Sequence, residues 1–101
     1  MTFKMSFSDE KIQQVWEKGT TVENYDKDKY RKDKCGAWMD REKYGDRNSM
    51  LGWEIDHIDP KGSDDLSNLR PLQWKNNVAK GEVRLECPVT ADGNNNVERK
   101  E

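Results

Sequence analysis

The chain has 101 residues and a formal net charge of −2, with 32% hydrophobic and 38% charged residues. This length leaves room for one small domain, and the charge argues against a nucleic-acid binder that relies on overall positive charge alone. No run of 18 apolar residues is present, so a membrane-spanning helix is not expected.

The first predicted element is a helix over residues 8–18. Ser8 is a favourable N-cap, and Asp9 and Glu10 follow in the first turn, where the helix dipole favours negative charge. Apolar residues then recur at helical spacing and define one buried face. They are Ile12, Val15 and Trp16.

A charged segment over residues 20–34 is expected to be an exposed connection. Its aspartates suggest a calcium loop, but that loop needs a glycine at its sixth position and a glutamate at its twelfth, where Arg31 and Ala37 stand. The apolar run Cys35–Met39 then predicts a short buried strand.

Alternation predicts a second strand over residues 51–58. Successive side chains point to opposite faces of a regular strand, so Asp56 and His57 would diverge. They can serve one site only if the strand ends or twists at this point. Asp59 and Pro60 follow directly and favour such an end.

Residues 68–72 predict a short extended segment, because Pro71 is unfavourable inside a helix. A helix over residues 73–80 follows. Trp74 and Val78, four positions apart, are expected to form its buried face.

The C-terminal part predicts a short strand within residues 83–89 and a disordered tail over residues 90–101, so a single domain is expected over residues 1–89. The cysteines, Cys35 and Cys87, lack metal-binding spacing and are expected to be free, buried thiols, with a disulfide as the less favoured alternative. An N-terminus without an apolar run predicts no signal peptide, and hence an intracellular, reducing compartment.

Three short motifs surround the only histidine of the chain. They are Asp56-His57-Ile58, Ser67-Asn68-Leu69 and Asn77-x-x-Lys80-Gly81. Together they resemble the HNH endonuclease family, in a branch of small bacterial and phage proteins. Upstream segments extend the resemblance, which covers roughly residues 16–84: Asp33–Ala37, Tyr44-Gly45 and Gly52–Ile55.

The resemblance implies an α+β fold with a ββα-metal (His-Me finger) core, an N-terminal helix and an extra short β-hairpin. It implies an endonuclease that hydrolyses phosphodiester bonds in DNA with one divalent metal ion, Mg²⁺ or alternatively Mn²⁺. His57 matches the general base that activates water, and Asp56 and Asn77 match the metal ligands. Asn68 matches the residue that ties the loop together and orients the histidine.

Elementary chemistry agrees with these roles. Carboxylate and amide oxygens are hard ligands that suit Mg²⁺ better than zinc, and histidine titrates near neutrality, as a general base should. No structural zinc is expected, since cysteine pairs are absent. Four basic residues are expected to contact phosphates: Arg47, Lys61, Arg70 and Lys80.

Two departures from the family stand out. The loop Asp59–Ser67 is short, with Gly62 alone where many members carry two glycines, and Asn77 replaces a histidine. The main alternative function is a catalytically weak or inactive HNH-fold module that binds nucleic acid or acts as an adaptor; a nuclease toxin or effector domain is a weaker one. Expected partners are double-stranded DNA and a protein of a larger phage or restriction system, in the cytoplasm of a bacterial or phage-infected cell.

Overall fold

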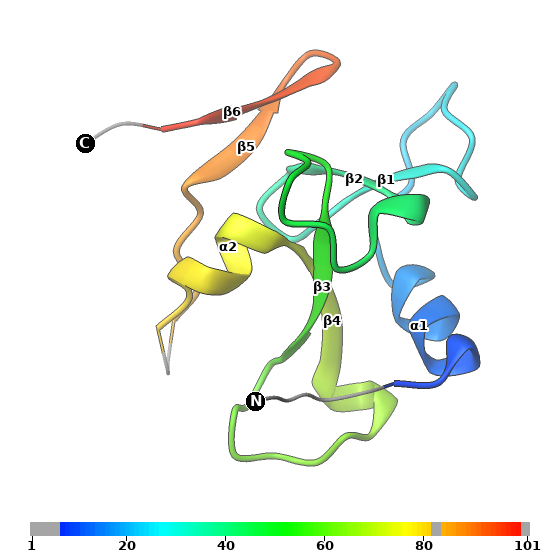
Figure 1. The fold of residues 1–101 in the computed structure, drawn as a ribbon, viewed down its shortest axis with the longest axis vertical. Helices are drawn as coiled ribbons and strands as arrows, with labels where there is room; N and C mark the ends of the chain where they lie inside the picture. Colours follow the sequence, from blue (N-terminus) through cyan, green and yellow to red (C-terminus); the bar gives the residue numbers. More distant parts are fainter. Residues whose placement is uncertain (1–6, 82–83, 100–101) are drawn as a thin grey trace.

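The computed structural model describes residues 7–81 and 84–99. In chain order its elements are α1 (Asp9–Trp16), β1 (Tyr30–Lys32), β2 (Trp38–Asp40), η1 (Arg41–Lys43), β3 (Trp53–His57), η2 (Leu66–Asn68), β4 (Leu69–Gln73), α2 (Trp74–Ala79), β5 (Val89–Asp92) and β6 (Asn95–Glu98). In this part of the chain the strands form three antiparallel pairs, β1–β2, β3–β4 and β5–β6 (Figure 1). The α+β class predicted from the sequence is confirmed.

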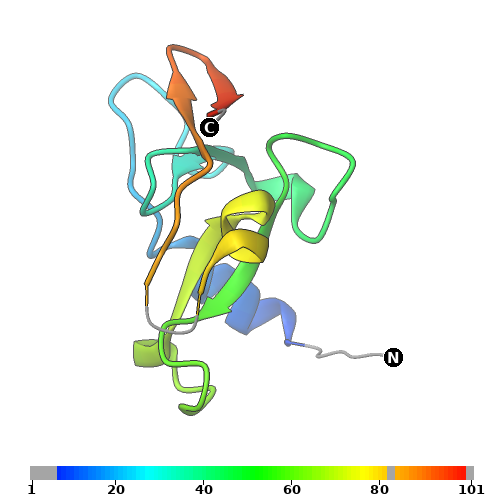
Figure 2. The same ribbon diagram turned by 90° about the vertical axis from the view of Figure 1, so that its left-hand side faces the viewer.

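The β3–β4 hairpin is the centre of the fold. Figure 2 shows α2 in front of this hairpin and α1 behind it. The predicted apolar face of α1 packs on the hairpin, with the rings of Trp16 and Trp53 5.2 Å apart. Four further buried side chains complete this core: Ile12, Val15, Met39 and Leu69. The helix begins as predicted, since the Ser8 hydroxyl accepts a hydrogen bond from the Lys11 amide at 3.1 Å.

The buried face of α2 differs from the prediction. Val78 is 58% exposed, whereas Asn76 is fully buried. The helix therefore meets its surroundings through polar side chains: Asn76 donates to Asp33, and Gln73 Oε1 accepts from the Lys75 amide at the helix start. Apolar residues four positions apart could not indicate the buried face of this helix, because its contacts are made by side-chain amides.

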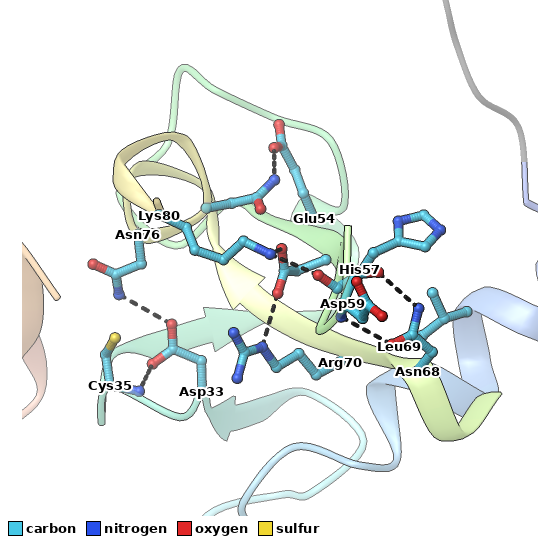
Figure 3. A network of polar contacts seen from close by, with 12 residues as sticks. Asp33, Cys35, Glu54, His57, Asp59, Asn68, Leu69, Arg70, Asn76 and Lys80 are labelled. Atoms are coloured by element: carbon cyan, nitrogen blue, oxygen red, sulfur yellow. Dashed lines mark hydrogen bonds and ion pairs between the residues drawn. The ribbon is translucent and has the colours of Figure 1, made fainter. Parts of the chain in front are cut away.

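A buried carboxylate, Asp33, joins two segments of the chain that are distant in the sequence. One oxygen accepts hydrogen bonds from the Cys35 and Ala37 amides at 2.9 and 2.8 Å. The other accepts from the Gln73 amide at 2.9 Å and from Asn76 Nδ2 at 3.0 Å. Figure 3 shows the bond between Asn76 and Asp33. These bonds hold residues 35–37 in a turn, and the strand predicted at residues 35–39 therefore occurs at Trp38–Asp40.

Asn76 extends this network to the C-terminal part. Its amide group donates to the Val89 carbonyl at 3.0 Å and accepts from the Val89 amide at 2.9 Å. Burial raises the pKa of Asp33 above its ordinary value of 3.8, and the hydrogen bonds to its ionised form limit the rise.

The two cysteines form a disulfide, Cys35–Cys87, with their Cα atoms 5.5 Å apart. The expectation of free thiols is wrong, because the fold brings two residues separated by 52 positions side by side. The reducing compartment stays a prediction, and disulfides are more typical of oxidising ones. In the described residues, no helix has the length and apolar character needed to cross a membrane.

The C-terminal tail contains a hairpin, and its predicted disorder is wrong for residues 90–98. Gly93, with φ of 64°, makes the turn between β5 and β6. Asn96 docks the hairpin: its Oδ1 accepts from the Trp38 amide at 2.7 Å, and its Nδ2 donates to the Trp38 carbonyl at 2.9 Å. The strand predicted within residues 83–89 falls partly outside the described residues, and β5 begins at Val89.

The disulfide should stabilise the folded state by restricting the unfolded chain. We expect the Cys35→Ser/Cys87→Ser variant to lose about 2–4 kcal/mol in the free energy of unfolding, measured by urea denaturation. A reducing agent should destabilise the parent similarly and leave the variant unchanged. Equal stability of the oxidised parent and the variant would contradict this expectation.

The Asp33 network predicts a cost for the isosteric change Asp33→Asn, because an amide nitrogen would then face N–H donors. We expect a loss of about 2 kcal/mol at neutral pH, whereas the exposed control Asp28→Asn should change little. Since the folded-state pKa of Asp33 is raised, the parent should gain stability relative to Asp33→Asn as the pH falls towards 3.8. Urea denaturation at several pH values measures this difference, and a shrinking difference on acidification would show that burial is not dominant.

Candidate functional site

Asp56 lies buried between β3, β4 and α2. Its Oδ2 accepts from Arg70 Nε on β4 at 2.8 Å, and its Oδ1 lies 2.7 Å from Lys80 Nζ. The carboxylate is 4% exposed. Two cations thus compensate one buried negative charge, which leaves a local excess of positive charge.

Lys80, the residue after α2, fixes the end of that helix against the end of β3. Its ammonium group contacts Asp56 and also donates to the His57 carbonyl at 2.6 Å. Asn77 lies one turn earlier in α2 and donates from Nδ2 to Glu54 Oε1 at 2.8 Å. Glu54 and Asp56 lie two positions apart on β3, so both face α2.

Glu54 is also held by Arg47 from the connection before β3. The guanidinium donates from Nε and one terminal nitrogen to the two carboxylate oxygens, at 2.6 and 2.9 Å. The hydrogen bond to Glu54 raises the pKa of Arg47. Arg47 and Asn77 thus donate to the same carboxylate, that of Glu54, and this places Arg47 at the edge of the site.

His57 points away from Asp56. β3 remains regular up to His57, which pairs with Leu69, and the two side chains therefore diverge as alternation predicts. The ring is 22% exposed, and its Nε2 lies 2.6 Å from Asp64 Oδ1. Figure 3 shows the imidazole directed away from Lys80. The two side chains share the same strand end but leave it on opposite faces.

Asn68 ties together the loop that follows His57. Its Oδ1 accepts from the Asp59 amide at 2.9 Å, and its Nδ2 donates to the carbonyls of Asp59 and Ser63 at 3.1 and 2.8 Å. Its own carbonyl accepts from the Ile58 amide at 2.8 Å. These are the loop-tying contacts expected of Asn68, and its contribution to catalysis stays a prediction.

The single glycine of the loop, Gly62, packs directly on Asn68. A Cβ atom at position 62 would lie 2.7 Å from Asn68 Nδ2, closer than such atoms approach. One glycine is therefore enough to let this short loop close over the asparagine amide.

The predicted site residues fall into two groups. The structure brings together Asp56, Arg70, Lys80 and the His57 backbone, and it places Asn77 and Arg47 around Glu54. Lys61 is exposed in the loop, where its amide donates to Asp59 Oδ1 at 3.0 Å.

Two residues of the site were not assigned from the sequence. Strand alternation did place Glu54 on the same face as Asp56, which is a usable signal for its proximity to α2. Asp64, which contacts His57, lies in an irregular loop whose conformation leaves no signature in the sequence.

The donor atoms available for a divalent ion are oxygens. In the described residues, no cluster of three or more His, Cys, Asp or Glu side chains is arranged to hold a metal. Asp56 on β3 and Asn77 on α2 offer a carboxylate and an amide oxygen, since Asn77 uses its nitrogen for Glu54. This set suits Mg²⁺, which commonly takes one or two protein oxygens and fills its other positions with water and phosphate. Lys80 would have to leave Asp56 Oδ1 for an ion to bind there.

No protein-family model, curated protein or solved structure matches this chain. What the protein does must therefore be inferred from its own residues.

The contacts of Asn68 predict that Asn68→Ala will loosen the 59–67 loop. Three side-chain hydrogen bonds disappear in this variant, including the one from the Asp59 amide. We expect faster hydrogen exchange at that amide, by about fivefold or more, since one lost hydrogen bond is worth about 1 kcal/mol or more. The neighbouring exposed change Ser67→Ala should leave the exchange rate unchanged. Equal protection in Asn68→Ala would show that other contacts hold the loop.

Proposed function

We propose that this protein is a metal-dependent endonuclease of the HNH type that hydrolyses phosphodiester bonds in DNA. The observation that carries the proposal is the double contact of Lys80 with the Asp56 carboxylate and the His57 carbonyl. Through it, the helix that bears Asn77 meets the strand end that bears the Asp-His pair. The sequence motifs that resemble the family thus occupy neighbouring elements.

His57 would act as the general base. If its Nε2 carries the proton and donates to Asp64, Nδ1 holds the lone pair that can accept a proton from water. The carboxylate would also stabilise the imidazolium that forms, as in other His–carboxylate pairs. Asn68 would keep the histidine in place by fixing the loop that begins after it.

The positive residues around Asp56 would bind the scissile phosphate. Arg70 and Lys80 meet at one carboxylate, so their charge is held close to the strand end. Asp56 and Asn77 are the residues that would hold Mg²⁺ or Mn²⁺. When bound, such an ion would stabilise negative charge on the phosphate and on the leaving oxygen.

A second function is favoured by a specific observation. Both oxygens of Asp56 already contact cations, and the His57 ring leaves β3 on the opposite face from Asp56 and contacts Asp64. A protein with this arrangement can bind nucleic acid through its cations without hydrolysing it. The alternative is therefore a non-catalytic HNH-fold module that binds nucleic acid or serves as an adaptor.

The deciding experiment incubates the protein with plasmid DNA, single-stranded DNA and RNA under a panel of divalent metals. We expect nicking or cutting of DNA with Mg²⁺ or Mn²⁺, and no cleavage with a chelator. His57→Ala should reduce the rate by about 10²–10⁴-fold, the usual contribution of a general base. Val97→Ala, at an exposed position on β6 outside the site, is the control and should cut like the parent.

Two outcomes would contradict the proposal. Cleavage by His57→Ala at the parental rate would show that His57 is not the general base. Binding of nucleic acid without turnover under every metal would favour the non-catalytic module instead.

A further inference from the structure

A cleft of about 300 Å³ opens beside the candidate site. Three segments that are distant in the sequence form its walls: the end of α1, the β1–β2 connection, and the ends of the β3–β4 hairpin. Its size lies at the lower end of the range for small-ligand sites in proteins.

The cleft is lined by cations. Lys18, Lys32, Lys34 and Arg70 contribute to its walls. Among the described residues that line it, Asp33 is the single acidic one, and its buried carboxylate already accepts four hydrogen bonds from N–H groups. The negative charge of Asp33 is thus directed into the protein, and the other charged side chains that line the cleft are positive.

In the part of the chain that the structure describes, these lysines have no carboxylate partner. Elsewhere on the molecule cations pair with acids, as Lys29 does with Asp40 and Lys75 with Glu98. Within the described residues, the three lysines of the cleft form no such pair; they are Lys18, Lys32 and Lys34. An uncompensated group of cations in a concave site attracts anions more strongly than the same charges dispersed over a convex surface.

Neutral contacts hold the cleft lysines. Lys32 Nζ lies 4.8 Å from the centre of the Trp38 ring, and the Lys32 backbone pairs with Thr20. The Lys18 ammonium donates to the carbonyls of Leu66 and Leu69. The contacted ring and carbonyls belong to residues outside the cleft lining, and they do not neutralise the lysine charges. Lys34 is exposed in the connection between β1 and β2.

Arg70 connects the cleft to the candidate site. Its Nε contacts Asp56, while the same side chain lines the cleft; Figure 3 shows its guanidinium directed towards the segment that bears Asp33. Ile58, directly after His57, lines the cleft as well. A nucleic-acid backbone bound in the cleft would therefore reach the end of β3, which carries the Asp-His pair.

We propose that this cleft binds the phosphodiester backbone of the nucleic acid next to the scissile bond, through Lys32, Lys34 and Arg70. The assignment of the ligand rests on the proposed function, whereas the preference for a polyphosphate follows from the charges themselves. Contacts to phosphates carry no base information, so this binding is independent of sequence.

The test measures binding without hydrolysis. A fluorescently labelled DNA oligonucleotide is titrated with the protein in a chelator, and anisotropy is recorded between 50 and 200 mM salt. Lys32→Gln and Lys34→Gln should each weaken binding severalfold for every sequence tried. Each should also reduce the slope of log Kobs against log salt by about 1, the value for one lost phosphate contact.

Matched variants separate local contacts from overall charge. Lys27→Gln removes the same charge from an exposed position outside the cleft and should leave the slope unchanged. Lys34→Arg keeps the charge and should bind like the parent. Thermal unfolding of each variant checks that the fold is retained.

The outcomes distinguish this inference from the proposed function. If the parent cuts DNA but Lys32→Gln and Lys34→Gln keep its affinity and slope, the cleft assignment is wrong and the nuclease proposal stands. If binding follows the prediction but no metal supports cleavage, the cleft assignment stands and the nuclease proposal fails. Equal competition by polyglutamate would overturn the preference for a phosphate backbone.

Discussion

The burial of one carboxylate, Asp33, constrains how the small domain is assembled. Its hydrogen bonds join the turn before β2 to the start of α2, and Asn76 carries the connection on to β5. A buried charge is tolerated only when donors surround it, so these segments cannot separate without exposing unpaired groups. Because α2 begins at this network, the directions of Asn77 and Lys80 towards β3 depend on it. The candidate site therefore rests on a polar interaction that lies outside it.

The second buried carboxylate, Asp56, has the opposite environment. Backbone and amide N–H groups surround Asp33, whereas two full positive charges meet Asp56. Hydrogen-bond donors of fixed geometry make a rigid junction, but an ammonium group on a flexible stem can be exchanged for another cation. Asp33 thus has a structural role, whereas the cation that partners Asp56 can be replaced by another. This division of roles would suit the metal-dependent site proposed above, since a ligand of such a site must be held in place before the ion arrives.

Periodicity predicted the elements that carry the site, and long-range contacts decided the rest. The faces of α1 and β3 follow from apolar spacing, and the Asn68 contacts follow from a local motif, because both depend on neighbouring residues. The Cys35–Cys87 bond and the docking of Asn96 join residues far apart in the sequence, and no spacing rule encodes them. The Asp92-Gly93 pair was a usable turn signal for the last hairpin. The polar composition of residues 90–101 instead led to a prediction of disorder. This hairpin is held by amide hydrogen bonds and needs few apolar residues.

The disulfide also determines which residues belong to one covalent ring. The chain from Cys35 to Cys87 is closed on itself, and this ring contains every residue assigned to hydrolysis, whereas α1, β1 and the β5–β6 hairpin lie outside it. A protease that cut once in the exposed 59–67 loop would leave both halves of the site linked. The nicked molecule would migrate as a single species until its disulfide was reduced. His57 and Lys80 would then lie on different fragments, held together by the folded structure alone.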